Sequence, residues 1–193
     1  MCGRYYIPEG HELADINAML ALIKSSYVGT AALAQMKSGE IFPTDIVPII
    51  TQEAPKLMQW GFEGLGGKGK IINARLETAA DKAMFRKAFA SQRCLVPAGY
   101  YFEWKKDGAK KEKFAIKKSE PIYMAGLWHK EANDAVPLFV ILTREASPEL
   151  KFIHDCMPVI LPKQERDSWL SGKSGAMQLA ECSEEHFTFE SVG

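Results

Sequence analysis

Apolar residues recur at three- and four-residue spacings in several parts of the chain, which is the pattern of helices with one buried face. The clearest stripe lies near the N-terminus and consists of Leu13, Ile16, Met19, Leu20 and Ile23. We predict helices over four ranges: 11–26, 77–91, 163–172 and 174–182.

Short runs of β-branched and aromatic residues, bounded by Gly, Pro and charged residues, predict strands elsewhere. They cover residues 45–50, 56–62, 93–104, 113–118, 121–128, 137–143 and 157–161. Strands outnumber helices and do not alternate with them regularly, so we expect an α+β fold with a mixed, mainly antiparallel, barrel-like sheet flanked by helices. No repeat or linker is visible in the 193 residues, so we predict a single domain over 1–193.

A glycine-rich stretch from Gly64 to Lys70, GLGGKGK, matches the first part of a phosphate-binding loop. The next residue is Ile71, where such a loop needs a Ser or Thr for its metal ion. The following IINARLE begins as a strand rather than as the helix whose N-terminus would bind phosphate. A flexible hairpin or loop is the better interpretation.

The composition is that of an ordinary soluble globular protein, with 47% hydrophobic and 25% charged residues. Basic and acidic residues both number 24, so any surface that attracts nucleic acid must be local. No apolar run reaches the roughly 18 residues of a membrane span, and no signal peptide is recognisable. We therefore expect a cytoplasmic protein with no membrane partner.

The four cysteines lie far apart and form no C-x-x-C motif, which favours neither a zinc site nor a disulfide framework. They are Cys2, Cys94, Cys156 and Cys182. We expect four reduced thiols, no metal site and no cofactor.

Cys2 directly follows the initiator methionine in MCGRYY. Removal of Met1 would leave Cys2 with a free amine of pKa about 7.7–8.0 beside a thiol of pKa about 8.5, so both nucleophiles would be partly available at neutral pH. Their natural electrophile is an aldehyde: the amine forms a Schiff base, and the thiolate then closes a five-membered thiazolidine. Position alone leaves open a simpler interpretation, a small residue buried at the chain terminus.

Three further stretches accompany MCGRYY: INARLET at Ile72–Thr78, GYYFEWKK at Gly99–Lys106 and IHDCMPVIL at Ile153–Leu161. Together, with FPTDIVPII and MQWGF between the first and second blocks, they resemble the SOS-response-associated peptidase (SRAP) family. Members of that family form covalent links to abasic sites in single-stranded DNA. The resemblance runs in order along nearly the whole chain. It implies that Cys2 is the nucleophile and that Asn73, Glu103 and His154 complete the catalytic site.

The resemblance further implies that the protein binds single-stranded DNA and forms a thiazolidine between Cys2 and the ring-opened aldehyde of an abasic site. The crosslink would be reversible and would shield the site during the DNA damage response, with AP-lyase or peptidase-type hydrolase activity as an additional expectation. The expected partner is single-stranded DNA that contains abasic sites. We expect a monomer that associates with the nucleoid when bound to DNA.

The residue types suit these roles. Glu103 lies between two aromatic residues, where desolvation would favour the protonated acid and let it protonate the sugar ring oxygen. His154 titrates near neutrality and could assist proton transfer at the sugar hydroxyl or in reversal. The Asn73 amide could orient the Cys2 amine or the sugar. The alternatives are a solvent-facing strand carboxylate, a packing histidine and a turn asparagine.

Single-stranded DNA binding needs phosphate contacts and aromatic platforms for bases. By resemblance, phosphates would be contacted by Arg4, Arg75 and Arg86, and bases would stack on Trp60 and Trp104. Solvated charge and core packing are the alternatives, the latter especially for Trp60. The Lys-rich segment 105–118 is either a basic rim of the groove or a soluble hairpin.

Two features depart from the family pattern. Where members usually have His-x-Arg, this chain has HDC, so Cys156 replaces a cation expected near the DNA backbone and affinity should be lower. The chain stops at FTFESVG, shorter than the usual ending, which puts a last strand or DNA-facing segment in doubt. With zero net charge, we expect weak nonspecific binding that falls steeply with salt.

Two other functions would use the same residues. A thiol peptidase would attack an amide carbonyl with Cys2, with His154 or Glu103 as base, and would need an oxyanion hole. A reader of modified DNA bases would use the same groove without covalent chemistry. Denaturing electrophoresis after incubation with abasic DNA separates the three functions, because only crosslinking gives a heat-resistant shifted band.

Overall fold

The computed structural model describes residues 2–8, 14–108, 110–131, 134–173 and 175–192. In chain order its strands and helices are β1 (Arg4–Ile7), α1 (Ala14–Ser26), α2 (Ala31–Ala34), β2 (Gly39–Ile41), β3 (Ile46–Ile49), β4 (Lys56–Trp60), β5 (Phe62–Glu63), β6 (Lys70–Ile71), β7 (Asn73–Arg75), α3 (Leu76–Ala79), α4 (Ala83–Ser91), β8 (Arg93–Asp107), β9 (Lys110–His129), β10 (Leu138–Glu145), β11 (Cys156–Pro158), α5 (Lys163–Leu170), α6 (Ala176–Cys182) and β12 (Thr188–Ser191). None of the helices within these ranges is long and apolar enough to span a membrane.

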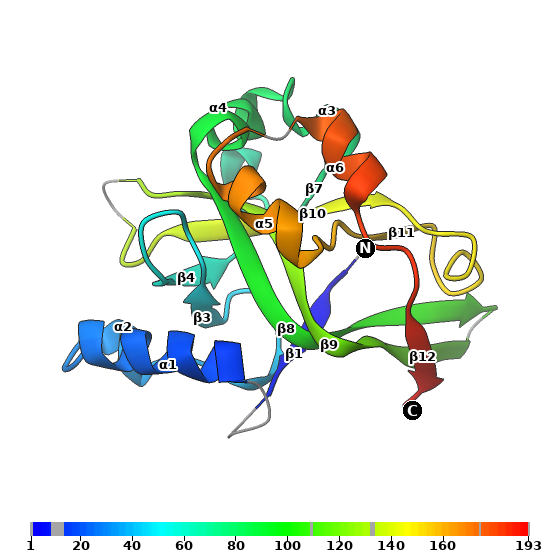
Figure 1. Ribbon diagram of the computed structural model, residues 1–193, viewed down its shortest axis with the longest axis horizontal. Coiled ribbons are helices and arrows are strands. Elements are labelled where there is room, and N and C mark those ends of the chain that lie inside the picture. The colour runs from blue at the N-terminus through cyan, green and yellow to red at the C-terminus, as the bar shows by residue number, and fades with distance from the viewer. Residues whose placement is uncertain (1, 9–13, 109, 132–133, 174, 193) are drawn as a thin grey trace.

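A curled sheet of ten strands lies at the centre of the described chain (Figure 1). Its main path is β2-β1-β8-β9-β10-β4-β3, with β7 and β11 paired to β10 and β12 paired to β9. Most neighbours are antiparallel, but β10 runs parallel to β4 and to β7. The prediction of an α+β fold with a mixed, barrel-like sheet is confirmed. The glycine-rich stretch connects β5 and β6 as a hairpin, as predicted.

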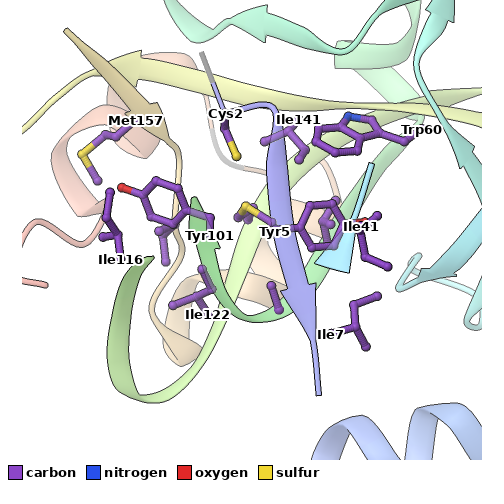
Figure 2. Close-up of a cluster of buried hydrophobic side chains, with 14 of the residues drawn as sticks. Cys2, Tyr5, Ile7, Ile41, Trp60, Tyr101, Ile116, Ile122, Ile141 and Met157 are labelled. Atoms are coloured by element: carbon purple, nitrogen blue, oxygen red, sulfur yellow. The ribbon is translucent and has the colours of Figure 1, made fainter. Parts of the chain in front are cut away.

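The central strand β10 contributes side chains to two separate cores, because successive side chains of a strand point to opposite faces of the sheet. Phe139 and Ile141 belong to a cluster that also contains Cys2 and Trp60 (Figure 2). Val140 and Leu142 belong to a second cluster, to which α3, α4, α5 and α6 contribute buried side chains. These four helices therefore cover one face of the sheet, while Cys2 is buried against the other.

The long hairpin of β8 and β9 carries two of the predicted site residues, Glu103 and Trp104 (Figure 1). The register between the two strands shifts between Ala98 and Tyr100, where the single residue Gly99 of β8 stands against residues 118–121 of β9, so the bulge lies on β9. A Cβ atom at Gly99 would lie 3.0 Å from the Pro8 ring, so the close approach of the N-terminal segment favours glycine here. Beyond the bulge, β8 continues through Glu103. Its pairing with β1 ends at Phe102, which lies opposite Arg4.

Several predicted boundaries were wrong. The two strands predicted at 113–118 and 121–128 are one strand, β9, which continues through the bulge where residues 118–121 have no partner on β8. The helix predicted over 77–91 is divided into α3 and α4, because Lys82 adopts an extended backbone and each half packs its own apolar residues. The short C-terminus had put a last strand in doubt. The structure has such a strand, β12, which pairs with β9.

The remaining predicted elements are present with shifted ends. The first helix begins at Ala14, and residues 11–13 of its predicted range lie outside the described residues. The strand predicted over 157–161 is β11, which begins at Cys156 and ends at Pro158. The strand β1, which contains Arg4, was not predicted as a strand and pairs with both β2 and β8.

Candidate functional site

Cys2 is completely buried between the N-terminal strand and the centre of the sheet (Figure 2). Its carbonyl oxygen accepts a hydrogen bond of 2.9 Å from Nδ2 of Asn73. Asn73 begins β7 and lies opposite Ile141 on β10, so parallel strand pairing places its amide beside Cys2. The other amide atom, Oδ1, is buried without a hydrogen-bond partner in the described residues. The fold therefore brings Asn73 into contact with Cys2, through the Cys2 carbonyl rather than through the amine predicted from the sequence.

The environment of Cys2 changes the expected state of its thiol. Burial, followed by the nearby charge of Glu103, raises the pKa of the Cys2 thiol well above its ordinary value. The thiol is therefore protonated at neutral pH in this environment, and the expectation of a partly available thiolate is corrected.

Glu103 lies in β8 beyond the bulge and opposite Phe114 of β9, with only 3% of its surface exposed. Burial raises the pKa of its carboxyl group from 4.5 to about 7. The acid and the carboxylate are therefore both populated near neutral pH, which is the condition for donating and then accepting a proton. The alternative of a solvent-facing carboxylate is excluded by its burial.

The raised pKa of Glu103 makes stability depend on pH. A carboxyl whose pKa is higher in the folded than in the unfolded state weakens folding as pH rises, with the full cost above about pH 7 and none well below 4.5. Glu103→Gln should therefore raise the free energy of unfolding at pH 8, by at most about 3 kcal/mol, and change it little near pH 4. Urea unfolding at the two pH values would test this.

A matched control for that prediction is Glu53→Gln. Glu53 is exposed, and its hydrogen bond to Lys56 lowers its pKa, so its removal should not stabilise the protein at pH 8. An equal gain from Glu103→Gln at both pH values would contradict the raised pKa.

His154 lies in the turn between β10 and β11 and is partly buried. Its Nδ1 accepts a 3.1 Å hydrogen bond from the backbone N–H of Cys156, so the neutral ring carries its proton on Nε2. Burial lowers the pKa of His154, which favours this neutral form at pH 7. Cys156 is itself buried, and its Sγ lies 3.4 Å from the same Nδ1. The residue in place of the expected arginine therefore contacts the predicted catalytic histidine.

Two pockets are lined by the predicted site residues. The first, here called the basic pocket, has a volume of about 630 Å³, and its lining includes Gly3, Arg4, Glu103, Trp104, Lys113 and His154. The second, the apolar pocket, has a volume of about 710 Å³ and is lined by residues that include Phe62, Asn73, Arg75, Met84, Phe85 and His129. Cys2 is fully buried and lines neither pocket, but its chain neighbour Gly3 lines the first and its hydrogen-bond partner Asn73 lines the second.

The residues predicted to bind DNA are distributed unevenly over this site. Arg4 and Trp104 both line the basic pocket, with the Arg4 guanidinium 5.3 Å from the centre of the Trp104 ring. Arg75 lines the apolar pocket and forms an ion pair with Glu77 at 3.1 Å. Arg86 is exposed on α4 and is not among the residues that line these two pockets in the described chain.

Trp60 does not offer a surface for base stacking. Its side chain is fully buried, its ring lies 5.1 Å from that of Tyr5, and its Nε1–H donates a 3.0 Å hydrogen bond to the carbonyl of Ile72 (Figure 2). The interpretation as a stacking or wedging residue is therefore replaced by core packing. Trp60 holds the residue immediately before Asn73 in place.

Sequence reasoning did not single out three residues beside the basic pocket: Glu40, Phe42 and Lys113. Lys113 belongs to the Lys-rich segment 105–118, so the sequence indicated a basic residue there but not which residues it contacts. Glu40 accepts hydrogen bonds from Lys113 and from Arg4, which are far from it in sequence. Within the described residues, no group of three His, Cys, Asp or Glu side chains is arranged to hold a metal ion.

Comparison with solved structures supports the fold. A protein from Bacteroides thetaiotaomicron has a TM-score of 0.76 at 20% identity, over 100% of this chain and 92% of that one. A phage-related protein from Bordetella bronchiseptica has a TM-score of 0.75 at 22% identity, over 99% of this chain and 94% of that one. At these identities the likeness concerns the fold alone.

Comparison with curated proteins gives relatives of higher identity. The abasic site processing protein YoaM of Bacillus subtilis is 38% identical over 54% of this chain and 49% of its own length. The abasic site processing protein YedK of Escherichia coli is 36% identical over 61% of this chain and 57% of its own length. The chain thus spans about half the length of the curated relatives it matches.

The ordered blocks that contain Cys2, Asn73, Glu103 and His154 are distributed along the whole chain, and the fold brings Asn73 into contact with Cys2. The family model described as "SOS response associated peptidase (SRAP)" matches residues 1–192. The chain therefore belongs to the SRAP family.

Proposed function

We propose that this protein processes abasic sites in single-stranded DNA by forming a covalent thiazolidine crosslink through Cys2. The observation that carries the proposal is the hydrogen bond from Asn73 to the Cys2 carbonyl, which holds Cys2 next to the basic pocket. The lining of that pocket includes Gly3, the neighbour of Cys2, and the buried acid Glu103. The names of the relatives, which are abasic site processing proteins, support DNA with abasic sites as the substrate.

The reaction begins once Met1 is removed and Cys2 has a free amine. The protonated Glu103 donates its proton to the sugar ring oxygen as the bond between that oxygen and the anomeric carbon breaks. The hydroxyl on the anomeric carbon loses its proton to water, and this carbon becomes the aldehyde. The amine attacks the aldehyde carbon, and loss of one water gives an imine. The thiol then adds to the imine carbon: a carbon–sulfur bond forms, the thiol proton passes to nitrogen, and the five-membered ring closes.

Two features of the site suit this order. The buried thiol is protonated, so it does not compete with the amine for the aldehyde in the first step. The later addition of the thiol to the imine is intramolecular. The effective concentration of the thiol is therefore high, and the step does not require a large population of thiolate. Asn73 holds the Cys2 carbonyl and thereby fixes the direction of the adjacent amine and thiol.

The decisive experiment is incubation of the protein with a labelled single-stranded oligonucleotide that contains one abasic site, followed by denaturing electrophoresis. A heat-resistant shifted band is expected with abasic DNA and none with the undamaged oligonucleotide. Binding without such a band would favour a noncovalent reader, and cleavage of an added peptide without the band would favour a thiol peptidase. Either result would overturn the proposal.

His154 is expected to matter more for reversal of the crosslink than for its formation. Its neutral ring, with the proton on Nε2, can donate a hydrogen bond from Nε2–H to the sulfur that leaves the ring carbon when the thiazolidine reopens. His154→Ala should still form the crosslink but release labelled DNA more slowly during a chase with unlabelled abasic competitor. His186→Ala is the control, since this histidine is 89% exposed and pairs with Glu149. Release as fast as in the parent protein would disprove the assignment.

A further inference from the structure

A single carboxylate neutralises two of the cations beside the basic pocket. Oε1 of Glu40 accepts hydrogen bonds from the Arg4 guanidinium at 3.0 Å and from Nζ of Lys113 at 2.9 Å. These three residues come from different strands, since Glu40 lies on β2 opposite Tyr6 of β1, and Lys113 lies on β9. Two donors that converge on one anionic oxygen are also the arrangement that binds a phosphate oxygen.

Aromatic rings hold both cations independently of Glu40. The Arg4 guanidinium lies 4.1 Å from the centre of the Phe42 ring and 5.3 Å from that of Trp104. Nζ of Lys113 lies 3.8 Å from the centre of the Phe102 ring and 5.8 Å from that of Trp104. Since these contacts place the two cations around Trp104, loss of the Glu40 charge should leave them in position.

Glu40 reduces the positive charge of the basic pocket. Four cationic residues line the basic pocket: Arg4, Lys106, Lys111 and Lys113. Within the described residues, Lys106 and Lys111 have no ion pair, whereas Arg4 and Lys113 share Glu40. Partial burial alone would raise the pKa of Glu40, but the hydrogen bonds from Lys113 and Arg4 outweigh it and lower the pKa, so the carboxylate stays charged at neutral pH.

We propose that Arg4 and Lys113 form one binding site for a phosphodiester group of the DNA strand, and that Glu40 is its built-in counter-ion, which weakens binding to undamaged DNA. The inference rests on the proposed function, because it identifies where that substrate's backbone is held. In the DNA-free protein Glu40 supplies the negative charge that the phosphate brings when the strand binds. The protein therefore binds any single-stranded DNA less tightly than it would if all four cations of the basic pocket were free of a counter-ion.

The test is Glu40→Gln, which keeps the size of the side chain and removes its charge. Binding of a fluorescent, undamaged single-stranded oligonucleotide should become about fivefold tighter at low salt, because one unit charge near a bound phosphate is removed. The plot of log affinity against log salt should steepen by about 0.7, the value for one additional effective phosphate contact on a single strand. Glu53→Gln, which removes an equal charge outside the pocket lining, should change neither quantity.

A second variant, Lys113→Gln, tests whether Glu40 and Lys113 act on the same phosphate. This change should weaken binding, and Glu40→Gln should gain less in the Lys113→Gln background than in the parent, because the two residues act on one phosphate. Unchanged or weaker binding by Glu40→Gln, or an unchanged salt slope, would overturn the inference, since Glu40 would then organise the cations rather than oppose the phosphate.

Crosslinking of abasic DNA by the unmodified protein, measured in parallel, separates the two claims. If the protein crosslinks but Glu40→Gln binds undamaged DNA like the parent, the inference fails and the proposed function stands. If the protein does not crosslink, the proposed function fails whatever the salt dependence shows.

Discussion

Cys2→Ala is expected to abolish the heat-resistant adduct with abasic DNA completely while leaving noncovalent binding to single-stranded DNA largely intact. Thiazolidine closure needs the thiol, whereas the cations of the basic pocket do not depend on it. Denaturing electrophoresis would measure the adduct, and fluorescence anisotropy would measure the binding. Cys182→Ala is the matched control, because Cys182 is a free cysteine on α6, outside the lining of both pockets.

A stable adduct of undiminished yield in Cys2→Ala would refute the thiazolidine mechanism. A second arm tests the amine. A protein with an uncleavable N-terminal extension keeps the Cys2 thiol but has no free α-amine, so it should not crosslink. Mass spectrometry of the intact protein, before and after exposure to abasic DNA, would identify the chain that carries the adduct. An adduct on a chain that still bears the extension would be incompatible with attack by the amine.

Glu103→Gln is expected to slow crosslink formation by about 10²- to 10⁴-fold, the usual contribution of general acid–base catalysis. Glutamine keeps the shape of the side chain but cannot donate a proton to the sugar ring oxygen. In the parent protein the rate should decline as the acid is lost above its pKa of about 7, and this decline should be absent in the variant. Quenched time courses across a pH series would measure both effects.

Glu190→Gln is the control for Glu103→Gln, because Glu190 lies on β12 and pairs with Lys117, outside the lining of both pockets. Crosslinking by Glu103→Gln at the parental rate would remove Glu103 from the proposed mechanism. Weaker DNA binding that accounts for the whole loss of rate would do the same, since the role assigned to Glu103 is in proton transfer.

Local patterns were sufficient for much of the fold. The strands β4, β8 and β10 could be predicted from their apolar runs, because a strand that is buried on one or both faces needs apolar residues whichever strands it pairs with. The aromatic neighbours of Glu103 likewise indicated desolvation before its burial was observed. The division between α3 and α4 was not visible, because the separation depends on how each half packs against the sheet rather than on apolar spacing.

By itself, the sequence determined the residue types available for chemistry: a cysteine behind Met1, an acid in an aromatic strand, a histidine near a late strand, and their order in the SRAP family blocks. Only the tertiary structure decided which of them meet. Asn73 reaches Cys2 across 71 positions in sequence through the parallel pairing of β7 with β10. Trp60 was buried rather than exposed, and Glu40 was placed between Arg4 and Lys113. These outcomes depend on strand register and burial, which are set by contacts between distant segments and leave no periodic signal along the chain.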